Sequence, residues 1–142
     1  LMLGTNDFQS MHPHNAWHAA TGVATLIGAI RSAPIEPGMP VPPVLVVCPP
    51  VLRPPSGPIA PKFDGADRKC TGLAVAYREM CEEQGCHFFD AGSVVNASPL
   101  DGVHLDAAEH LTLGQALVAV VDGLLAHPEA QAEDPRAAGA AQ

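Results

Sequence analysis

The stretch SPLDGVHLDAAEH, residues 98–110, places an aspartate and a histidine three positions apart. A histidine that acts as a general base needs one ring nitrogen free and the other held by an acceptor, usually a carboxylate. Within a turn, this spacing lets Asp101 reach the ring of His104, and Gly102 permits the tight backbone that the contact requires. The pair is therefore a candidate half of a site for nucleophilic catalysis. The alternative is that Asp101 only begins a turn and that His104 lies on the surface.

A second polar cluster follows the apolar residues 1–3, where the sequence reads LGTND. An asparagine directly after a strand can point its amide across the edge of a sheet, where it could donate a hydrogen bond to a developing oxyanion. Asparagine is also common in turns for local reasons, because its side chain bonds to nearby backbone groups. Asn6 is thus a candidate oxyanion donor, and an ordinary turn residue is the alternative.

Three histidines in HPHNAWH, residues 12–18, raise the question of a metal site, since imidazole is a common zinc ligand. His14 and His18 are four positions apart and could share a helix face, but no acidic or cysteine ligand stands beside them in the sequence. We therefore expect no metal, and we place these histidines near the mouth of a substrate site or in solvent, with a metal-binding protein that uses them as the alternative. Trp17, the only tryptophan, either packs in the core or forms a wall for an acyl or aryl group.

The segments that must position these residues alternate between short apolar runs and longer periodic stretches. We expect strands at residues 1–3, 44–48 and 86–91, and helices at 15–31, 67–84 and 106–126. Asn15 is the expected N-cap of the first helix. The second helix is expected to carry an apolar side made of Cys70, Leu73, Tyr77, Met80 and Cys81. This order predicts an α/β fold in which helices pack on both faces of a parallel sheet, with functional groups in the loops after the strands.

Length, charge and hydropathy limit the classes of protein to consider. With 142 residues the chain is long enough for one domain with a core. Its formal net charge of -8 and its seven scattered Lys and Arg residues argue against nucleic acid or an anionic membrane as a partner, since both need clustered positive charge. No stretch approaches the roughly 20 apolar residues of a transmembrane helix, so we expect no membrane association.

The cysteines, the proline-rich loop and the carboxy-terminal stretch complete the expectations. None of the four cysteines forms a C-x-x-C pair, and free thiols are expected, in a reducing cytoplasmic compartment. Loop 49–62 is interpreted as a rigid rim or as a contact between subunits, which leaves a homo-oligomer open. From residue 127 to residue 142 the composition turns to Pro, Glu, Gln, Ala and Gly, and a disordered tail is expected there.

Together, the two polar motifs resemble the SGNH (GDSL-like) hydrolase superfamily. The third sequence block of that superfamily is G-x-N-D, here Gly4 to Asp7, and its fifth is D-x-x-H, here Asp101 to His104. The resemblance extends to VLVVCPP (44–50) between the blocks and to FFDAGSVV (88–95) just upstream of the second. It covers about residues 1–126 and most closely suggests the arylesterase and acyltransferase branch.

The resemblance implies a flavodoxin-like three-layer α/β fold and acyl transfer through a serine ester, without a cofactor or metal, on a small carboxylic ester. It makes Asn6 an oxyanion donor, and His104 the general base that activates the serine and later protonates the leaving alcohol. Asp101 would hold and charge-stabilise His104, and Asp7 would brace its loop. Trp17, beside the first loop, is a candidate residue for substrate contact.

The chain departs from the family pattern at the nucleophile. The family's serine lies in a G-D-S block after the first strand, and a second oxyanion donor is a glycine of the next block, but neither block is present here. None of the five serines of the chain follows Gly-Asp. Residues 1–126 are therefore expected to be the carboxy-terminal part of one domain, inactive alone, with the serine preceding Leu1. The alternatives are a non-catalytic α/β module that binds a ligand, or an inactive fragment.

Overall fold

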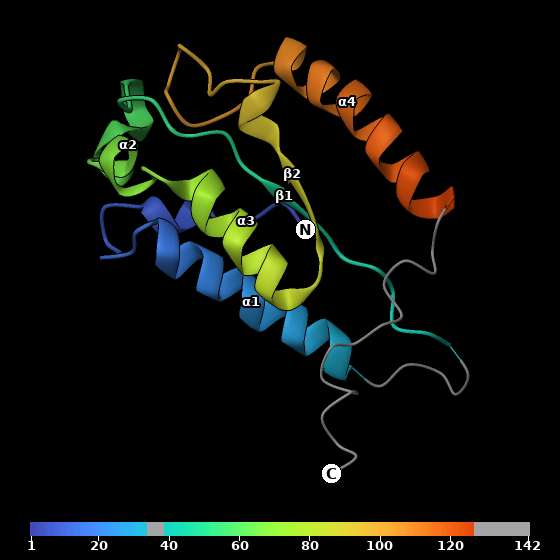
Figure 1. Ribbon diagram of the computed structural model, residues 1–142. Helices are drawn as coiled ribbons and strands as arrows, with labels where there is room; N and C mark the ends of the chain where they lie inside the picture. Colours follow the sequence, from blue (N-terminus) through green and yellow to red (C-terminus); the bar gives the residue numbers. More distant parts are fainter. Residues whose placement is uncertain (34–38, 127–142) are drawn as a thin grey trace.

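A computed structural model describes residues 1–33 and 39–126 of the chain, and the tail expected at 127–142 lies outside these described residues. The helices and strands are α1 (Ala16–Ser32), β1 (Leu45–Cys48), α2 (Ala66–Lys69), α3 (Leu73–Gln84), β2 (His87–Asp90) and α4 (Ala107–Ala126). Three short 3₁₀ turns lie between them: η1 (Thr5–Phe8), η2 (Gly57–Lys62) and η3 (Ala91–Ser93). The order along the chain is the alternation of strand and helix that the sequence predicts (Figure 1).

Three parallel extended segments lie side by side. β1 pairs with β2 in parallel, with Val46 opposite Phe88. On the other side of β1, the amino group of Leu1 donates to the carbonyl of Leu45 at 2.6 Å, and the amide of Val47 donates to the carbonyl of Leu1 at 2.8 Å. Leu1 thus bonds to the residues on either side of Val46, which is the hydrogen-bond pattern of parallel strands. The expected strand at residues 1–3 is thus present as a short segment that pairs with β1.

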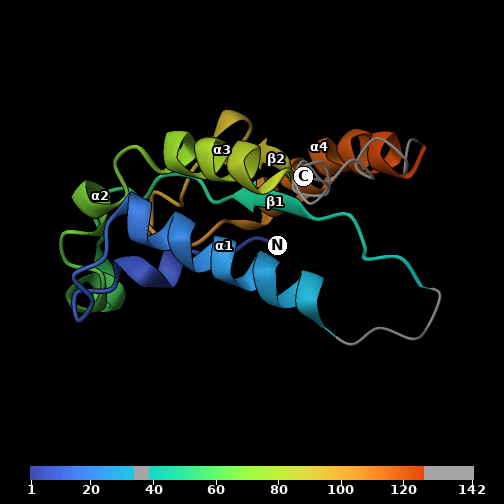
Figure 2. The ribbon, with the colours of Figure 1, turned by 60° about the horizontal axis from the view of Figure 1, so that its bottom comes forward.

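Side chains along β1 alternate between two apolar clusters. Val46 and Cys48 belong to a core with α1 and α3, whereas Val47 belongs to a second core with Leu113 of α4. Figures 1 and 2 show α1 and α3 side by side and α4 apart from both. Because both faces of the strand are covered, its sequence is apolar without alternation. The predicted α/β fold with helices on both faces of a parallel sheet is confirmed.

Helix α1 begins at a capping box. The Asn15 side chain accepts a hydrogen bond from the His18 amide at 3.2 Å, and the Asn15 amide donates to the His18 ring at 3.3 Å, as the predicted N-cap requires. The buried stripe of the helix is Ala16, Ala19, Ala20, Val23 and Ile27. Trp17 lies off this stripe and is 65% exposed, so the interpretation that it packs in the core is wrong.

The helix expected at 67–84 is two helices. The expected apolar side is buried as predicted, but the chain turns between α2 and α3, where Gly72 has φ of +80°. This left-handed conformation interrupts an α-helix and is available to glycine at little cost. The prediction of one continuous helix is therefore wrong at Gly72, while its burial pattern holds.

Helix α4 is apolar but mostly exposed. Leu113 is its one buried residue among those described. Large apolar side chains on its outer surface are Leu111, Val118, Val121 and Leu125. By length and composition alone this 20-residue helix could cross a membrane, so the expectation that no segment reaches that length is wrong. A single helix of this kind does not identify a membrane protein.

The four cysteines are free thiols, as expected. Cys48, Cys70 and Cys81 are buried, and burial raises the pKa of Cys48 to about 12. A thiol with a raised pKa stays protonated and unreactive at neutral pH. These buried cysteines therefore behave as small apolar core residues.

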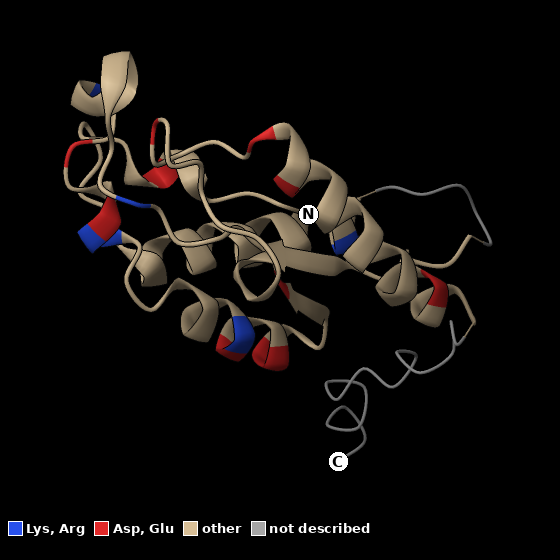
Figure 3. Cartoon of the chain, turned by 90° about the horizontal axis from the view of Figure 1, so that it is seen from above, with Lys and Arg blue, Asp and Glu red and all other residues tan. Residues whose placement is uncertain are grey.

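Charged side chains are interspersed over the described surface. Figure 3 shows Lys and Arg at separate places on several elements, with Asp and Glu on the same and on other elements. The scatter of basic residues seen in the sequence thus holds in space. That nucleic acid is not a partner stays a prediction.

The turn at Gly4 joins the first extended segment to η1 in a space too small for a side chain. Gly4 has φ of +114°, and a methyl group on its Cα would overlap the hydroxyl of Tyr77. That hydroxyl, on a fully buried ring of α3, donates to the carbonyl of Leu3 at 2.9 Å. Tyr77 therefore fixes the end of the extended segment against the core.

We expect Gly4→Ala to lower the free energy of unfolding by about 2–4 kcal/mol, from the left-handed backbone and the overlap together. Gly22→Ala is the matched control, because Gly22 is helical with nothing within 4 Å of an added methyl group. It should raise the free energy of unfolding by about 0.5–1 kcal/mol. Urea denaturation followed by circular dichroism measures both. Equal stability of Gly4→Ala and the parent chain would contradict the prediction.

Candidate functional site

Asp101 and His104 form a short hydrogen bond in the loop before α4. The Nδ1 of His104 lies 2.6 Å from Oδ2 of Asp101. The other carboxylate oxygen, Oδ1, accepts the backbone N–H groups of Val103 at 2.8 Å and of His104 at 3.0 Å. Gly102 makes the tight turn between them with φ of +79°. The structure thus brings the two predicted residues together within one turn.

The environment of Asp101 keeps its carboxyl group ionised. The hydrogen bond with His104 lowers the pKa of Asp101 to about 2, and the N–H groups of Val103 and His104 add to this effect. A carboxylate that accepts several hydrogen bonds is stabilised in its charged form. The His104 side chain is 66% exposed, and with Nδ1 held by Asp101 its Nε2 has no hydrogen-bond partner among the described residues. A carboxylate that holds one ring nitrogen of an exposed histidine is an arrangement that can support general-base chemistry.

A buried serine closes the loop that carries this pair. The amide of Ser98 donates to the carbonyl of His104 at 2.7 Å, and its carbonyl accepts from the amide of Gly102 at 2.8 Å. Its hydroxyl donates to Asp106 at 2.8 Å and accepts from the Leu100 amide at 3.1 Å. Ser98 is 2% exposed. Sequence reasoning missed this role, because the motif spacing gives no sign of which residue ties the loop together.

All five serine hydroxyls donate to carbonyl or carboxylate oxygens in the described part of the chain. The acceptors are Pro61 for Ser10, Gly28 for Ser32, Leu100 for Ser56, Asp90 for Ser93 and Asp106 for Ser98. None of these contacts involves His104. No serine within the described residues is therefore paired with the candidate base.

Asn6 and His104 line the same cavity of about 560 Å³. Asn6 lies in η1, directly after the extended segment that pairs with β1. Its Oδ1 accepts a hydrogen bond from Gln9 at 3.0 Å, which orients the amide and leaves its N–H₂ group as a donor. The rest of the lining is Thr5, Ile59, Lys62, Phe63, Val103, Leu105 and His110. The structure therefore brings an amide donor and a candidate base to one surface.

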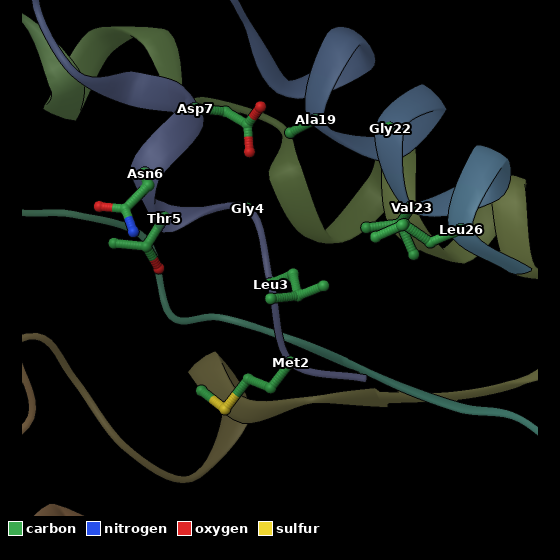
Figure 4. A pocket seen from close by; sticks show the side chains of 10 residues that line it. All are labelled: Met2, Leu3, Gly4, Thr5, Asn6, Asp7, Ala19, Gly22, Val23 and Leu26. Atoms are coloured by element: carbon green, nitrogen blue, oxygen red, sulfur yellow. The ribbon is translucent and has the colours of Figure 1, made fainter.

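A second cavity of about 480 Å³ lies on the other side of Thr5 and Asn6, which line both cavities. It is bounded by residues 2–7 and by α1 (Figure 4). In Figure 4 the Asp7 carboxylate points toward α1 and the Asn6 side chain points away from it. The apolar part of its lining comes from Met2 and Leu3 and from the face of α1 opposite them.

The three histidines near α1 stack on one another. Ring centroids are 5.3 Å apart for His12 and His14 and 5.5 Å apart for His14 and His18. Nδ1 of His14 lies 3.4 Å from a carboxylate oxygen of Asp7. Among residues 1–33 and 39–126, no three His, Cys, Asp or Glu side chains are grouped so that they could hold a metal ion. The stack runs from the loop after η1 to the first turn of α1.

Trp17 and two cavity residues differ from the sequence predictions. The Trp17 ring lies edge-on against His18, with centroids 5.2 Å apart, and it lines neither of the two cavities. The structure thus does not bring Trp17 to the surface that Asn6 and His104 share. Lys62 and His110, by contrast, line the cavity of Asn6 and His104, and no sequence motif marks them. Lys62 comes from the end of η2 and His110 from α4, so only the tertiary fold brings them to the cavity.

A family model and several solved structures match the chain. The chain matches the model of the GDSL-like Lipase/Acylhydrolase family over residues 1–133. It resembles the structure of the native M. smegmatis aryl esterase, at 35% identity and a TM-score of 0.80, covering 87% of this chain and 59% of that one. It also resembles a carbohydrate acetylesterase family member from Sinorhizobium meliloti, at 36% identity and a TM-score of 0.80, covering 88% and 60%.

Est24, a carbohydrate acetylesterase from Sinorhizobium meliloti, is a further similar structure, at 33% identity and a TM-score of 0.80. That match covers 87% of this chain and 59% of Est24. The chain thus spans about three fifths of the length of the solved structures that it matches. No curated protein matches it.

We expect Asp101→Asn to destabilise the chain at pH 7 but not near pH 2. The pKa of this carboxyl group is lowered from 3.8 to about 2 on folding. Ionised Asp101 therefore stabilises the folded state above about pH 4, and this contribution is lost as the pH falls from about 4 to about 2. Urea denaturation at a series of pH values measures the difference in free energy of unfolding between Asp101→Asn and the parent chain. A difference that is the same at every pH would contradict the prediction.

Proposed function

The chain belongs to the GDSL-like lipase/acylhydrolase family, and from this membership we propose that it supplies the base and an oxyanion donor of a serine ester hydrolase. The observation that carries the proposal is the convergence of His104, held by Asp101, and Asn6 on one cavity. A general base and an oxyanion donor must both lie near the reacting carbonyl group. The two groups come from loops almost a hundred residues apart in the sequence, so their convergence is a property of the fold.

In the proposed reaction, Nε2 of His104 takes the proton of a serine hydroxyl as the serine attacks the ester carbonyl. Asp101 accepts the Nδ1–H bond, which holds the ring in the tautomer that leaves Nε2 free. It also stabilises the imidazolium that forms. The protonated His104 then gives its proton to the leaving alcohol, and the acyl-serine passes its acyl group to water or to an acceptor alcohol.

Asn6 is the proposed donor to the negative charge that develops on the carbonyl oxygen. Its Oδ1 is occupied by Gln9, so the N–H₂ group is the part of the amide available to substrate. The cavity around it has apolar walls from Ile59, Phe63 and Leu105, which suit the carbon chain of a small carboxylic ester. Trp17 stays a candidate for substrate contact outside this cavity.

We assign the nucleophile to a segment outside these 142 residues. No Gly-Asp-Ser block occurs in the chain, and the matched aryl esterase is longer, since the chain covers 59% of it. The backbone of residues 1–3 pairs with β1 on one side, and no described strand pairs with its other side. The cavity of about 480 Å³ beside these residues would receive that segment. Residues 1–142 alone would then bind ester without hydrolysing it.

The role of His104 is tested in the product of the complete reading frame, with a short-chain p-nitrophenyl ester as substrate. We expect His104→Ala to lower kcat by about 10³–10⁴, because the serine loses its base. His87→Ala is the control, since His87 lies on β2 and lines neither described cavity. Turnover by His104→Ala at the parent rate would remove His104 from the proposal.

The same assay tests Asn6. We expect Asn6→Ala to lower kcat by about 10²–10³ with little change in KM, because an oxyanion donor acts mainly in the transition state. A rise in KM at unchanged kcat would instead show that Asn6 only binds the substrate.

The assignment of the nucleophile is tested with a fluorophosphonate probe, which labels activated serines. Residues 1–142 alone should remain unlabelled, and the complete product should be labelled at a serine outside them. Peptide mapping by mass spectrometry locates the label. A label on one of the five serines of this chain would show that the nucleophile has been assigned wrongly.

A further inference from the structure

A short segment of the proline-rich loop after β1, residues 53–56, is hydrogen-bonded to the loop that carries Asp101. The Arg53 amide donates to the carbonyl of Gly102 at 2.9 Å, and the Ser56 amide donates to the carbonyl of Asp101 at 3.0 Å. The Ser56 hydroxyl donates to the carbonyl of Leu100 at 2.6 Å. Three consecutive carbonyl groups of the Asp101 loop thus accept hydrogen bonds from one short segment.

The two loops are also in direct contact. Gly102 has φ of +79°, and a methyl group on its Cα would lie 2.8 Å from the carbonyl oxygen of Pro54 and 2.9 Å from that of Arg53. Real Cβ atoms do not approach backbone oxygens so closely, so one of the loops would have to move. The separation of the loops is therefore fixed by contact as well as by hydrogen bonds.

The segment that makes these bonds is itself stiff. Pro54 and Pro55 have fixed φ angles and no N–H group, and the two bonded amides, of Arg53 and Ser56, lie on either side of them. The segment is tied to the core at Leu52, whose side chain is buried and whose amide donates to the sulfur of Cys70 at 3.3 Å. A stiff segment fixed at one end can hold a neighbouring loop in place.

We infer that Ser56 is a positioning residue for the Asp101–His104 pair: it fixes the backbone from which the Asp101 side chain projects. The inference rests on the proposed function only for its consequence in catalysis. Ser56 hydrogen-bonds to the backbone carbonyls of Leu100 and Asp101, whereas the Asp101 carboxylate bonds to Val103 and His104. The 2.6 Å contact between Asp101 and His104 depends on the backbone position of Asp101, and a shift below 1 Å would lengthen it.

The test follows the carboxyl group of Asp101 by carbon-13 NMR through an acid titration of residues 1–142. Ser56→Ala should raise the midpoint of this titration by about one pH unit, because a longer contact with His104 stabilises the carboxylate less. The signal of the His104 Nδ1 proton should broaden at the same time. Ser56→Thr, which keeps the hydroxyl group, should restore both signals.

The matched control is Ser93→Ala. Its hydroxyl makes a bond of the same length, 2.6 Å, to the carbonyl of Asp90, in a different loop. This variant should leave the Asp101 titration unchanged. Gly102→Ala would push the Asp101 loop away from Arg53 and Pro54. It should therefore raise the midpoint of the Asp101 titration as Ser56→Ala does.

An unchanged midpoint in Ser56→Ala and Gly102→Ala would overturn the inference, as would an equal rise in Ser93→Ala. The titration needs no turnover, so it stands apart from the assays of His104 and Asn6. In the complete product, Ser56→Ala should lower kcat about tenfold with KM unchanged, and Ser56→Thr should restore it. A loss that appears only in KM would place Ser56 in substrate binding instead and overturn its positioning role.

Discussion

A carboxylate that holds an imidazole at the surface of a protein has to remain ionised and also remain in place. Asp101 meets both requirements by giving one oxygen to the ring of His104 and the other to two backbone N–H groups. The left-handed turn at Gly102 brings those N–H groups within reach, and the buried hydroxyl of Ser98 closes the loop. The local geometry of the Asp101–His104 pair therefore depends on the backbone of residues 98–104.

The sheet determines which other groups this loop can meet. Parallel strands deliver the loops that follow them to the same edge, so the turn after residues 1–3 arrives beside the turn before α4. The alternation of side chains along β1 packs α1 and α3 on one face and α4 on the other. Asn6 and His104 thereby line one cavity without any direct bond between their own loops.

Features that depend on neighbours in sequence could be predicted, and those that depend on distant segments could not. The N-cap at Asn15 and the contact of Asp101 with His104 each need only three residues of spacing, which the sequence displays. The exposure of Trp17 depends on which side of α1 faces α3. The break at Gly72 depends on a left-handed turn that helix propensity alone does not reveal. The contact of Ser56 with Leu100 joins residues 44 apart, and no local pattern marks it.

The pairing of residues 1–3 with β1 has a consequence for the order in which the chain folds. Leu1 bonds to Leu45, 44 residues further along the chain, and the strands β1 and β2 are separated by a similar number of residues. Closing such long loops costs entropy before the contacts repay it, so the sheet forms late and slowly. During synthesis α1 emerges with its own cap before β1 and α3, so its buried stripe stays uncovered until these two elements follow.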